Sequence, residues 1–190
     1  PSSGGRQMPQ HFGHKDLNIV SQSSPTGTQY LQAVGAGFVL KREGNGAVVY
    51  VSSGEGTTSQ GDFHEALNWA SREKAPVIFH IENNGYAISV PISEQTSGES
   101  VYDICAGYDS LSRFNVDGCD FFETMLAFNK AVERARSGKG PSVIVSNVVR
   151  LLPHSSSDDQ RKYRDEKDLE ADRQRDPLIL FRKKCVEEGI

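Results

Sequence analysis

Two apolar segments of strand length, with a helix-forming stretch between them, constrain the fold of this chain most strongly. Residues 47–51 form a continuous apolar run, and residues 77–81 are a second segment of the same kind. Between them, Asp62 and Glu65 fit an acidic variant of the capping box that opens a helix over residues 62–74. Continuous apolar runs are typical of strands buried on both faces of a parallel sheet. The pattern predicts a β–α–β unit whose two strands end at the same edge of a sheet.

The segments on either side continue this alternation. Small and apolar residues predict a closely packed helix over residues 28–41, and residues 113–116 and 142–149 are predicted strands. Asp120 and Glu123 repeat the capping pattern ahead of an apolar helical face, whose members are Phe121, Met125, Phe128, Val132 and Ala135. Alternating strands and helices predict an α/β fold: a doubly wound, mostly parallel sheet with helices on both faces.

The same patterns divide the chain into three parts. Residues 1–24 lack periodicity and predict an extended N-terminal arm, and residues 25–150 hold the α/β domain. Residues 151–190 combine a loop with a highly charged tail, whose last stretch, residues 177–190, has enough Leu, Ile and Phe to dock as a helix.

Composition excludes several classes of protein. The 190 residues are 36% hydrophobic and carry a net charge of −4, which is typical of a soluble domain and does not favour nucleic-acid binding. No run of 18 apolar residues predicts a membrane span. The three cysteines are odd in number and unclustered, so we expect free thiols in a reducing compartment.

Polar residues follow both strands of the predicted β–α–β unit. Gly54-Glu55-Gly56 follows the first strand, and Asn83-Asn84-Gly85-Tyr86 follows the second. Because ligands bind at the carboxyl ends of parallel strands, Glu55 and Asn84 are expected to converge there. Carboxylate and amide oxygens with phosphates are the ligands that Mg²⁺ prefers, and glycines allow the backbone to approach phosphate. The spacing therefore predicts a site for a magnesium-bound diphosphate cofactor.

Each half of this pattern is common by itself, because Gly-Glu-Gly forms turns and Asn-Gly is a frequent turn dipeptide. The specificity comes from the combination in its strand context. Two other nucleotide motifs are absent from the sequence, which contains neither GxGxxG nor GxxxxGK[ST].

The two motifs together resemble the thiamine diphosphate motif of the 2-oxo acid dehydrogenases. Residues 83–89 are most similar to the alpha subunit of the branched-chain members, and the resemblance covers nearly the whole chain. It implies a thiamine diphosphate-binding fold with magnesium held by Glu55, Asn84 and the backbone carbonyl of Tyr86. Gly56 and Thr57 would then contact the diphosphate.

The resemblance implies roles for two further segments. Ser24 and Thr26 would contact the aminopyrimidine ring, and a structural potassium ion would be held by Ser23, Pro25, Thr28 and Gln29. His154 matches the active-site histidine, which contacts the cofactor phosphate and assists acyl transfer, in a loop braced by Arg150 and Asp158. Ser155 falls at the position that is phosphorylated in mitochondrial relatives, and we interpret it as an unmodified serine.

The implied activity is oxidative decarboxylation of a branched-chain 2-oxo acid with reductive acylation of lipoamide. The implied partners are a beta subunit or fused beta half, which supplies the activating glutamate, and a lipoyl-bearing acyltransferase core. The implied compartment is the bacterial cytoplasm or the mitochondrial matrix. The family's N-terminal Tyr-Arg pair has no match here, so we expect a fragment of a longer alpha subunit or fused chain, inactive alone.

Three positions depart from the family pattern. Thr26 replaces a bulky apolar residue, Glu82 replaces an arginine of branched-chain relatives, and Pro153 replaces a histidine. Glu82 would add negative charge near the phosphates, which weakens the assignment of substrate more than that of cofactor. Two alternatives therefore stay open: a pyruvate- or acetoin-type dehydrogenase, and a non-catalytic α/β assembly module.

Overall fold

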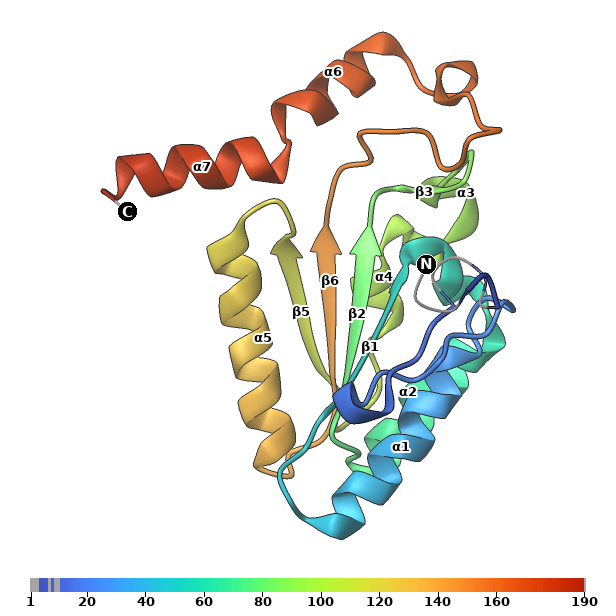
Figure 1. Cartoon of the computed structure of the whole chain (residues 1–190), viewed down its shortest axis with the longest axis vertical. Coiled ribbons are helices and arrows are strands. Elements are labelled where there is room, and N and C mark those ends of the chain that lie inside the picture. Colours follow the sequence, from blue (N-terminus) through green and yellow to red (C-terminus); the bar gives the residue numbers. More distant parts are fainter. Residues whose placement is uncertain (1–3, 7, 9–10, 190) are drawn as a thin grey trace.

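The computed structural model describes residues 4–6, 8 and 11–189 (Figure 1). Its main sheet has four parallel strands in the order β1-β2-β6-β5, namely β1 (Val49–Gly54), β2 (Val77–Asn83), β6 (Ser142–Asn147) and β5 (Ser112–Asp117). The helices α1 (Gln29–Glu43) and α2 (Gly61–Glu73) lie on one side of this sheet, and α5 (Phe121–Arg136) lies on the other (Figure 1). The predicted α/β architecture with helices on both faces is confirmed.

Strand β2 lies inside the sheet, and its side chains contribute alternately to two separate hydrophobic cores. Phe79 and Ile81 of β2 pack with Tyr30 of α1 and Phe63 of α2, all fully buried. Ile78, on the opposite face of β2, packs with Val116, Ile144 and α5. Successive strand residues point to opposite faces, so a strand covered on both sides must be apolar at nearly every position.

The first predicted strand differs from this description. The strand begins at Val49, and only Val51 of β1 is buried, while Tyr50 is 55% exposed. β1 lies at one end of the described sheet, and α5 packs over β2, β5 and β6 instead. The prediction that this run is buried on both faces was therefore wrong.

One of the two predicted helix caps is correct. Asp120 accepts hydrogen bonds from Phe122 N and Glu123 N at 2.9 and 3.1 Å, as an N-cap residue should. The cap at Asp62 was wrong, because α2 begins one residue earlier, and Gln60 at its N-cap makes no side-chain capping bond. Asp62 lies instead in the first turn, where its charge favours the positive end of the helix dipole.

The ends of the chain have more structure than the sequence indicated. The predicted extended arm contains a short 3₁₀ helix, η1 (Lys15–Leu17), and a backbone bridge between His14 and Ile19. Residues 1–3, 7 and 9–10 of that arm lie outside the described residues. The charged tail forms α6 (Glu166–Gln174) and α7 (Pro177–Glu187), which lie beyond the carboxyl ends of the strands (Figure 1). The helix predicted in the last stretch of the tail is therefore present, and it docks at the start of α5, where the Phe181 ring lies 5.0 Å from the Phe121 ring and Lys184 pairs with Asp120 at 2.7 Å.

Short elements connect β2 to β5 and pack near the strand tips. They are β3 (Tyr86–Ala87), β4 (Val90–Pro91), α3 (Ile92–Gln95), η3 (Ser97–Glu99) and α4 (Val101–Ile104). Two more 3₁₀ helices are η2 (Glu55–Ser59), which directly follows β1, and η4 (Gln160–Lys162). In the part of the chain that the structure describes, no helix combines the length and apolarity needed to cross a bilayer.

Candidate cation and cofactor site

The Glu55 carboxylate lies at the carboxyl edge of the sheet and contacts the asparagine loop, as the spacing predicted. β1 and β2 pair so that Gly54 stands opposite Glu82, which places the two strand ends side by side. Glu55 is fully buried, and its Oε2 accepts a hydrogen bond from the backbone N–H of Asn84 at 3.1 Å. The contact uses the backbone of Asn84, whereas the sequence predicted convergence of the two side chains.

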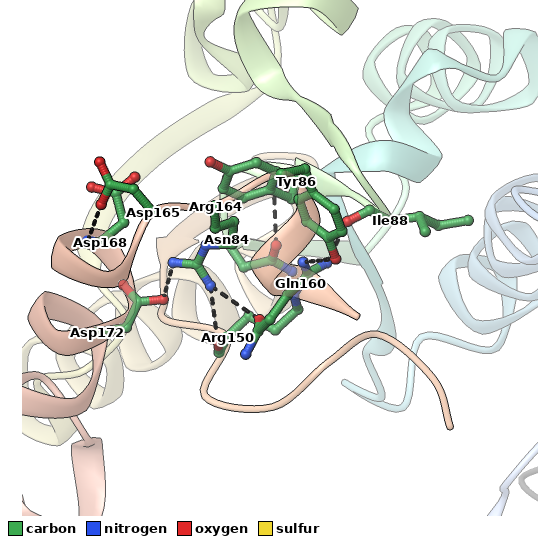
Figure 2. Close-up of polar contacts among 10 residues, drawn as sticks. Asn84, Tyr86, Ile88, Arg150, Gln160, Arg164, Asp165, Asp168 and Asp172 are labelled. Atoms are coloured by element: carbon green, nitrogen blue, oxygen red, sulfur yellow. Dashed lines mark hydrogen bonds and ion pairs between the residues drawn. The ribbon is translucent and has the colours of Figure 1, made fainter. Parts of the chain in front are cut away.

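The Asn84 side chain is turned into its own loop. Its Oδ1 accepts a hydrogen bond from Tyr86 N at 3.2 Å (Figure 2). The neighbouring Asn83 Oδ1 accepts from Gly85 N at 3.1 Å, and Gly85 adopts a left-handed φ of 81° that favours glycine. Asn83 is held in turn by Asn147, whose Oδ1 accepts from its amide nitrogen at 3.1 Å. The loop that carries Asn84 and Tyr86 is therefore fixed from both sides.

The second carboxylate oxygen of Glu55 has no such contact. Oε1 is buried without a hydrogen-bond partner in the described structure, although buried polar atoms are nearly always paired. Burial raises the pKa of this carboxyl above its ordinary value, and the nearby backbone N–H groups and the Arg150 guanidinium oppose the rise. An unpaired carboxylate oxygen in a buried position fits a bound cation, because the positive charge offsets the cost of desolvation.

The donors available here suit a hard cation that also binds phosphate. Within the described residues, no cluster of three or more His, Cys, Asp or Glu side chains could hold a metal ion. A cation at Glu55 would therefore complete its coordination with neutral oxygens, phosphate oxygens and water, as Mg²⁺ commonly does. The residues present thus fit the predicted magnesium site.

Gly56 lets the loop after β2 lie against the turn after β1. A Cβ atom at Gly56 would stand 2.8 Å from the Ala87 Cβ and 3.3 Å from its Cα, closer than real contacts allow. On the other side of the turn, Thr58 Oγ1 donates to the Glu55 carbonyl at 2.7 Å. Thr57 lies between them in η2 and accepts from Gln60 N through its carbonyl.

The residues of the predicted potassium site lie together at the start of α1. The single proton of Thr28 Oγ1 goes to the Pro25 carbonyl at 3.0 Å, so the Ser23 hydroxyl donates to Thr28 in the hydrogen bond between them. Gln29 Oε1 is turned to Gly27 N at 3.1 Å. Oxygens of Ser23, Pro25 and Thr28 therefore converge, whereas the Gln29 oxygen has a separate partner.

The two residues predicted to contact the aminopyrimidine ring, Ser24 and Thr26, are exposed. Ser24 Oγ lies 3.1 Å from His11 Nε2 on the N-terminal arm. Gly27, directly after Thr26, approaches η2, because a Cβ there would stand 2.9 Å from the Gln60 Cβ. This segment therefore lies beside Gln60, the residue that joins η2 to α2.

The loop that carries His154 is held by a chain of hydrogen bonds. Arg150 donates to the Ile88 carbonyl at 2.8 Å (Figure 2). It also donates to the Tyr163 hydroxyl at 2.7 Å. Tyr163 donates to Asp158 Oδ2 at 2.6 Å, and the same oxygen accepts from the backbone N–H of His154 at 2.9 Å. These bonds hold the pKa of the Asp158 carboxyl below its ordinary value, with Tyr163 as the largest cause.

The Tyr86 ring joins this loop to the cation site. The guanidinium groups of Arg164 and Arg150 lie 5.1 and 5.5 Å from its centroid (Figure 2). The Tyr163 ring lies 5.9 Å away. Such distances allow attraction between a cation and the face of an aromatic ring. Arg164 is itself buried and forms an ion pair with Asp172 of α6 at 2.6 Å.

The family model for the dehydrogenase E1 component matches residues 1–190, the whole chain. The chain belongs to this family. It is 44% identical over its full length to the 2-oxoisovalerate dehydrogenase subunit alpha of Bacillus subtilis, of which it covers 57%. It is 39% identical over 98% of its length to the pyruvate dehydrogenase E1 component subunit alpha of Staphylococcus aureus, of which it covers 49%. This E1 component chain therefore spans about half the length of these curated relatives.

A solved structure shows a similar fold. The transketolase of Campylobacter jejuni superimposes with a TM-score of 0.54 and 20% identity, over 66% of the E1 component chain and 20% of the transketolase. The predicted family and fold class are thus confirmed.

Three contacts of the E1 component chain were missed in the sequence. Gln95, Tyr163 and Arg164 have partners 40, 13 and 8 residues away, namely the Glu55 carbonyl, Arg150 and Asp172. No local pattern in the sequence marks these side chains for such contacts. Only the tertiary contacts reveal what these side chains do.

Glu82 lies in a different environment from the one expected. Its carboxylate is 3.9 Å from His80 Nδ1, and it shares a strand face with Ile78, which packs against α5. Tyr50 and Ser146 contact the two nitrogens of the same histidine at 2.9 and 3.0 Å. The nearest charged or titratable partner described for the Glu82 carboxylate is therefore His80.

Proposed function

We propose that this chain is the alpha part of a thiamine diphosphate-dependent 2-oxo acid dehydrogenase. The reaction is the decarboxylation of a branched-chain 2-oxo acid followed by reductive acylation of a lipoyl group. The observation that carries the proposal is the buried Glu55 carboxylate, with one oxygen on the Asn84 N–H and the other without a partner. Family membership supports it, and a protein without a cofactor has no need of such a group.

The proposed magnesium ligands are Glu55 Oε1, Asn84 Oδ1 and the Tyr86 carbonyl. Asn84 Oδ1 has two lone pairs, of which Tyr86 N occupies one, so the other is free to face an ion. Gly56 and Thr57 are the proposed diphosphate contacts, and the cation anchors the cofactor by its charged end. Bound thiamine diphosphate would supply the carbon nucleophile and the electron sink for decarboxylation.

The segment before α1 is the proposed contact for the rest of the cofactor. We assign Ser24 and Thr26 to the aminopyrimidine ring, and a potassium ion to Ser23, Pro25, Thr28 and Gln29. The convergence of three of these oxygens supports the potassium assignment. Binding of the ion would require Thr28 to exchange its present hydrogen bond for coordination.

His154 is the proposed catalytic residue of the loop. Its side chain is exposed, which suits proton transfer to an incoming acyl carrier, while its backbone is fixed by Asp158. The Arg150–Tyr163–Asp158 chain is proposed to position it. Histidine is the side chain that most often transfers protons as a general acid or base in enzymes.

The partners and compartment follow from this assignment. We propose a beta subunit or fused beta half that completes the site, and a lipoyl-bearing acyltransferase core as the acceptor. Free Cys105, Cys119 and Cys185 support a reducing compartment, either bacterial cytoplasm or mitochondrial matrix. A pyruvate substrate is the second candidate, because the Staphylococcus aureus relative is nearly as similar as the branched-chain one.

Calorimetric titration of the assembled enzyme with Mg²⁺ and thiamine diphosphate tests the cofactor assignment. Glu55→Ala and Asn84→Ala are expected to abolish measurable cofactor binding while the circular dichroism spectrum is retained. Glu170→Ala is the matched control, because Glu170 is an exposed acid that pairs with Arg173 on α6. Undiminished affinity in both site variants would refute the assignment, and an assembly that binds no cofactor at all would support the non-catalytic module. Decarboxylation rates across branched-chain 2-oxo acids and pyruvate decide the substrate.

A further inference from the structure

Gln95, at the end of α3, contacts the turn that carries the buried carboxylate. Its Nε2 donates to the Glu55 carbonyl at 3.2 Å, beside the 2.7 Å bond from Thr58 Oγ1 to the same oxygen. A carbonyl oxygen only accepts hydrogen bonds, so Gln95 must present its nitrogen to it. This contact fixes the side of the amide on which Oε1 lies.

The amide oxygen of Gln95 lacks a partner. Oε1 is buried and has no hydrogen bond in the described structure, and it lies 3.7 Å from the position of a Cβ atom at Gly56. Glu55 Oε1, on the adjacent residue of the same turn, is likewise buried and unpartnered. Two unpaired acceptors at one turn require donors or positive charge, because buried polar atoms are rarely left unpaired.

We infer that Gln95 Oε1 accepts a hydrogen bond from a water molecule coordinated to the divalent cation. The inference rests on the proposed function. Mg²⁺ commonly keeps several of its waters when bound to protein, and a coordinated water is a stronger donor than a free one. An acceptor oxygen beside Gly56 would repel phosphate directly, so a metal-bound water is the donor that suits both groups. Gln95 thus holds the Glu55 turn with one atom and orients the cation's hydration with the other.

A simpler role for Gln95 is support of the Glu55 carbonyl alone. Three substitutions separate the two roles. Gln95→Met removes both donor and acceptor, Gln95→Glu keeps an acceptor but loses the donor, and Thr58→Val removes the other donor to the same carbonyl. Ser93→Glu controls for added charge, because Ser93 is an exposed residue of the same short helix.

The measurement is the Mg²⁺ dissociation constant of the assembled enzyme at saturating thiamine diphosphate, with Mn²⁺ spectra as a second readout of hydration. Gln95→Met is expected to weaken Mg²⁺ binding by about 10- to 100-fold, the usual effect of losing a group that orients a metal's ligands. Gln95→Glu should stay within about threefold of the wild type, and Thr58→Val likewise, because each retains the acceptor at residue 95. The Mn²⁺ spectrum should change in Gln95→Met alone.

Each other outcome has a distinct meaning. Equal weakening in Gln95→Met, Gln95→Glu and Thr58→Val would assign Gln95 to carbonyl support and overturn the inference. Unchanged affinity in Gln95→Met would also overturn it. If the wild type binds no Mg²⁺, or binds it independently of Glu55, the proposed function fails as well.

Discussion

The loop that holds Glu55 and the loop that holds His154 are built on opposite principles. Glu55 is fully buried, and its turn is packed so tightly that Gly56 leaves no room for a methyl group. His154 is exposed, and its backbone is held by hydrogen bonds through Asp158 and Tyr163 to Arg150. The comparison distinguishes two parts of the proposed site. The Glu55 turn is closely packed, which suits binding of a cation, whereas the His154 loop is open to solvent, which suits contact with an acyl carrier.

The difference has an energetic basis. Close packing transmits strain and tolerates little change, whereas loops with few buried apolar contacts open at low free-energy cost. The Tyr86 ring, with Arg150 and Arg164 near its faces, links the two regions. Damage to the packed turn should therefore reach the loop, while damage to the loop should leave the turn intact.

The largest effect is expected from Gly56→Ala. The new Cβ would overlap Ala87, so the Asn84–Tyr86 turn must move, at a cost of about 1–3 kcal/mol in the free energy of unfolding. Affinity for thiamine diphosphate should fall by about 100-fold or more, because misplacement by one ångström can cost that much. Chemical denaturation and calorimetry measure the two effects. Gly61→Ala is the control, because no atom lies within 4 Å of a Cβ there; equal losses in both variants would contradict the packing argument.

A smaller and more selective effect is expected from Tyr163→Phe. Loss of the hydroxyl separates Arg150 from Asp158, so the carboxylate that accepts from the His154 N–H is no longer held in place by Tyr163. Acyl transfer to the lipoyl acceptor should slow by about tenfold, with cofactor affinity nearly unchanged, because only the positioning of the loop is lost. Single-turnover acylation and calorimetry give the two numbers. Tyr108→Phe, which removes a 3.5 Å contact to the His64 carbonyl, should change neither. A parallel fall in affinity would show that the two loops are not separable.

The same contrast explains what the sequence could predict. The β–α–β unit, the helix after Asp120 and the contact of Glu55 with the loop of Asn84 all follow from local patterns and strand order. The predicted apolar face of that helix was only partly right, because Phe121 and Met125 are exposed and the buried residues of α5 are Ala127, Ala131 and Ala135. The exposure of β1 could not be predicted, because it depends on β5 and β6 both joining the sheet on the far side of β2, which leaves β1 at its end. Gln95 and Glu55 are 40 residues apart, and the side of the sheet on which Glu82 lies depends on strand register. Such features come from tertiary contacts that no short pattern contains.

The acidity of the buried carboxylate provides a third test, with an effect on the order of 1 kcal/mol for each unit of pKa shift. Burial raises the pKa of Glu55 in the folded state, so the folded protein binds that proton more tightly than the unfolded chain. The resulting stabilisation is complete below the ordinary value of 4.5 and is lost as pH rises through the raised folded value.

Glu55→Gln should therefore be more stable than the wild type at pH 7 without metal, and the difference should shrink as pH falls toward 4.5. Denaturation curves across this range give the comparison. Saturating Mg²⁺ and cofactor should reverse the order, because only the carboxylate gains from the cation. A constant difference at all pH values would show that Glu55 does not titrate abnormally in the folded protein.

The smallest effect is expected from Glu82→Gln. This substitution tests whether a charge only two residues away from Asn84 influences cofactor binding. The Glu82 carboxylate is directed at His80, whose pKa is lowered by burial and raised in turn by this charge. Removal of the charge should move the His80 titration to lower pH in an NMR experiment. Cofactor affinity should change by less than about twofold, since solvent screens an exposed charge. A large gain in cofactor affinity would instead show that the Glu82 carboxylate repels the diphosphate. That result would contradict its position beside His80.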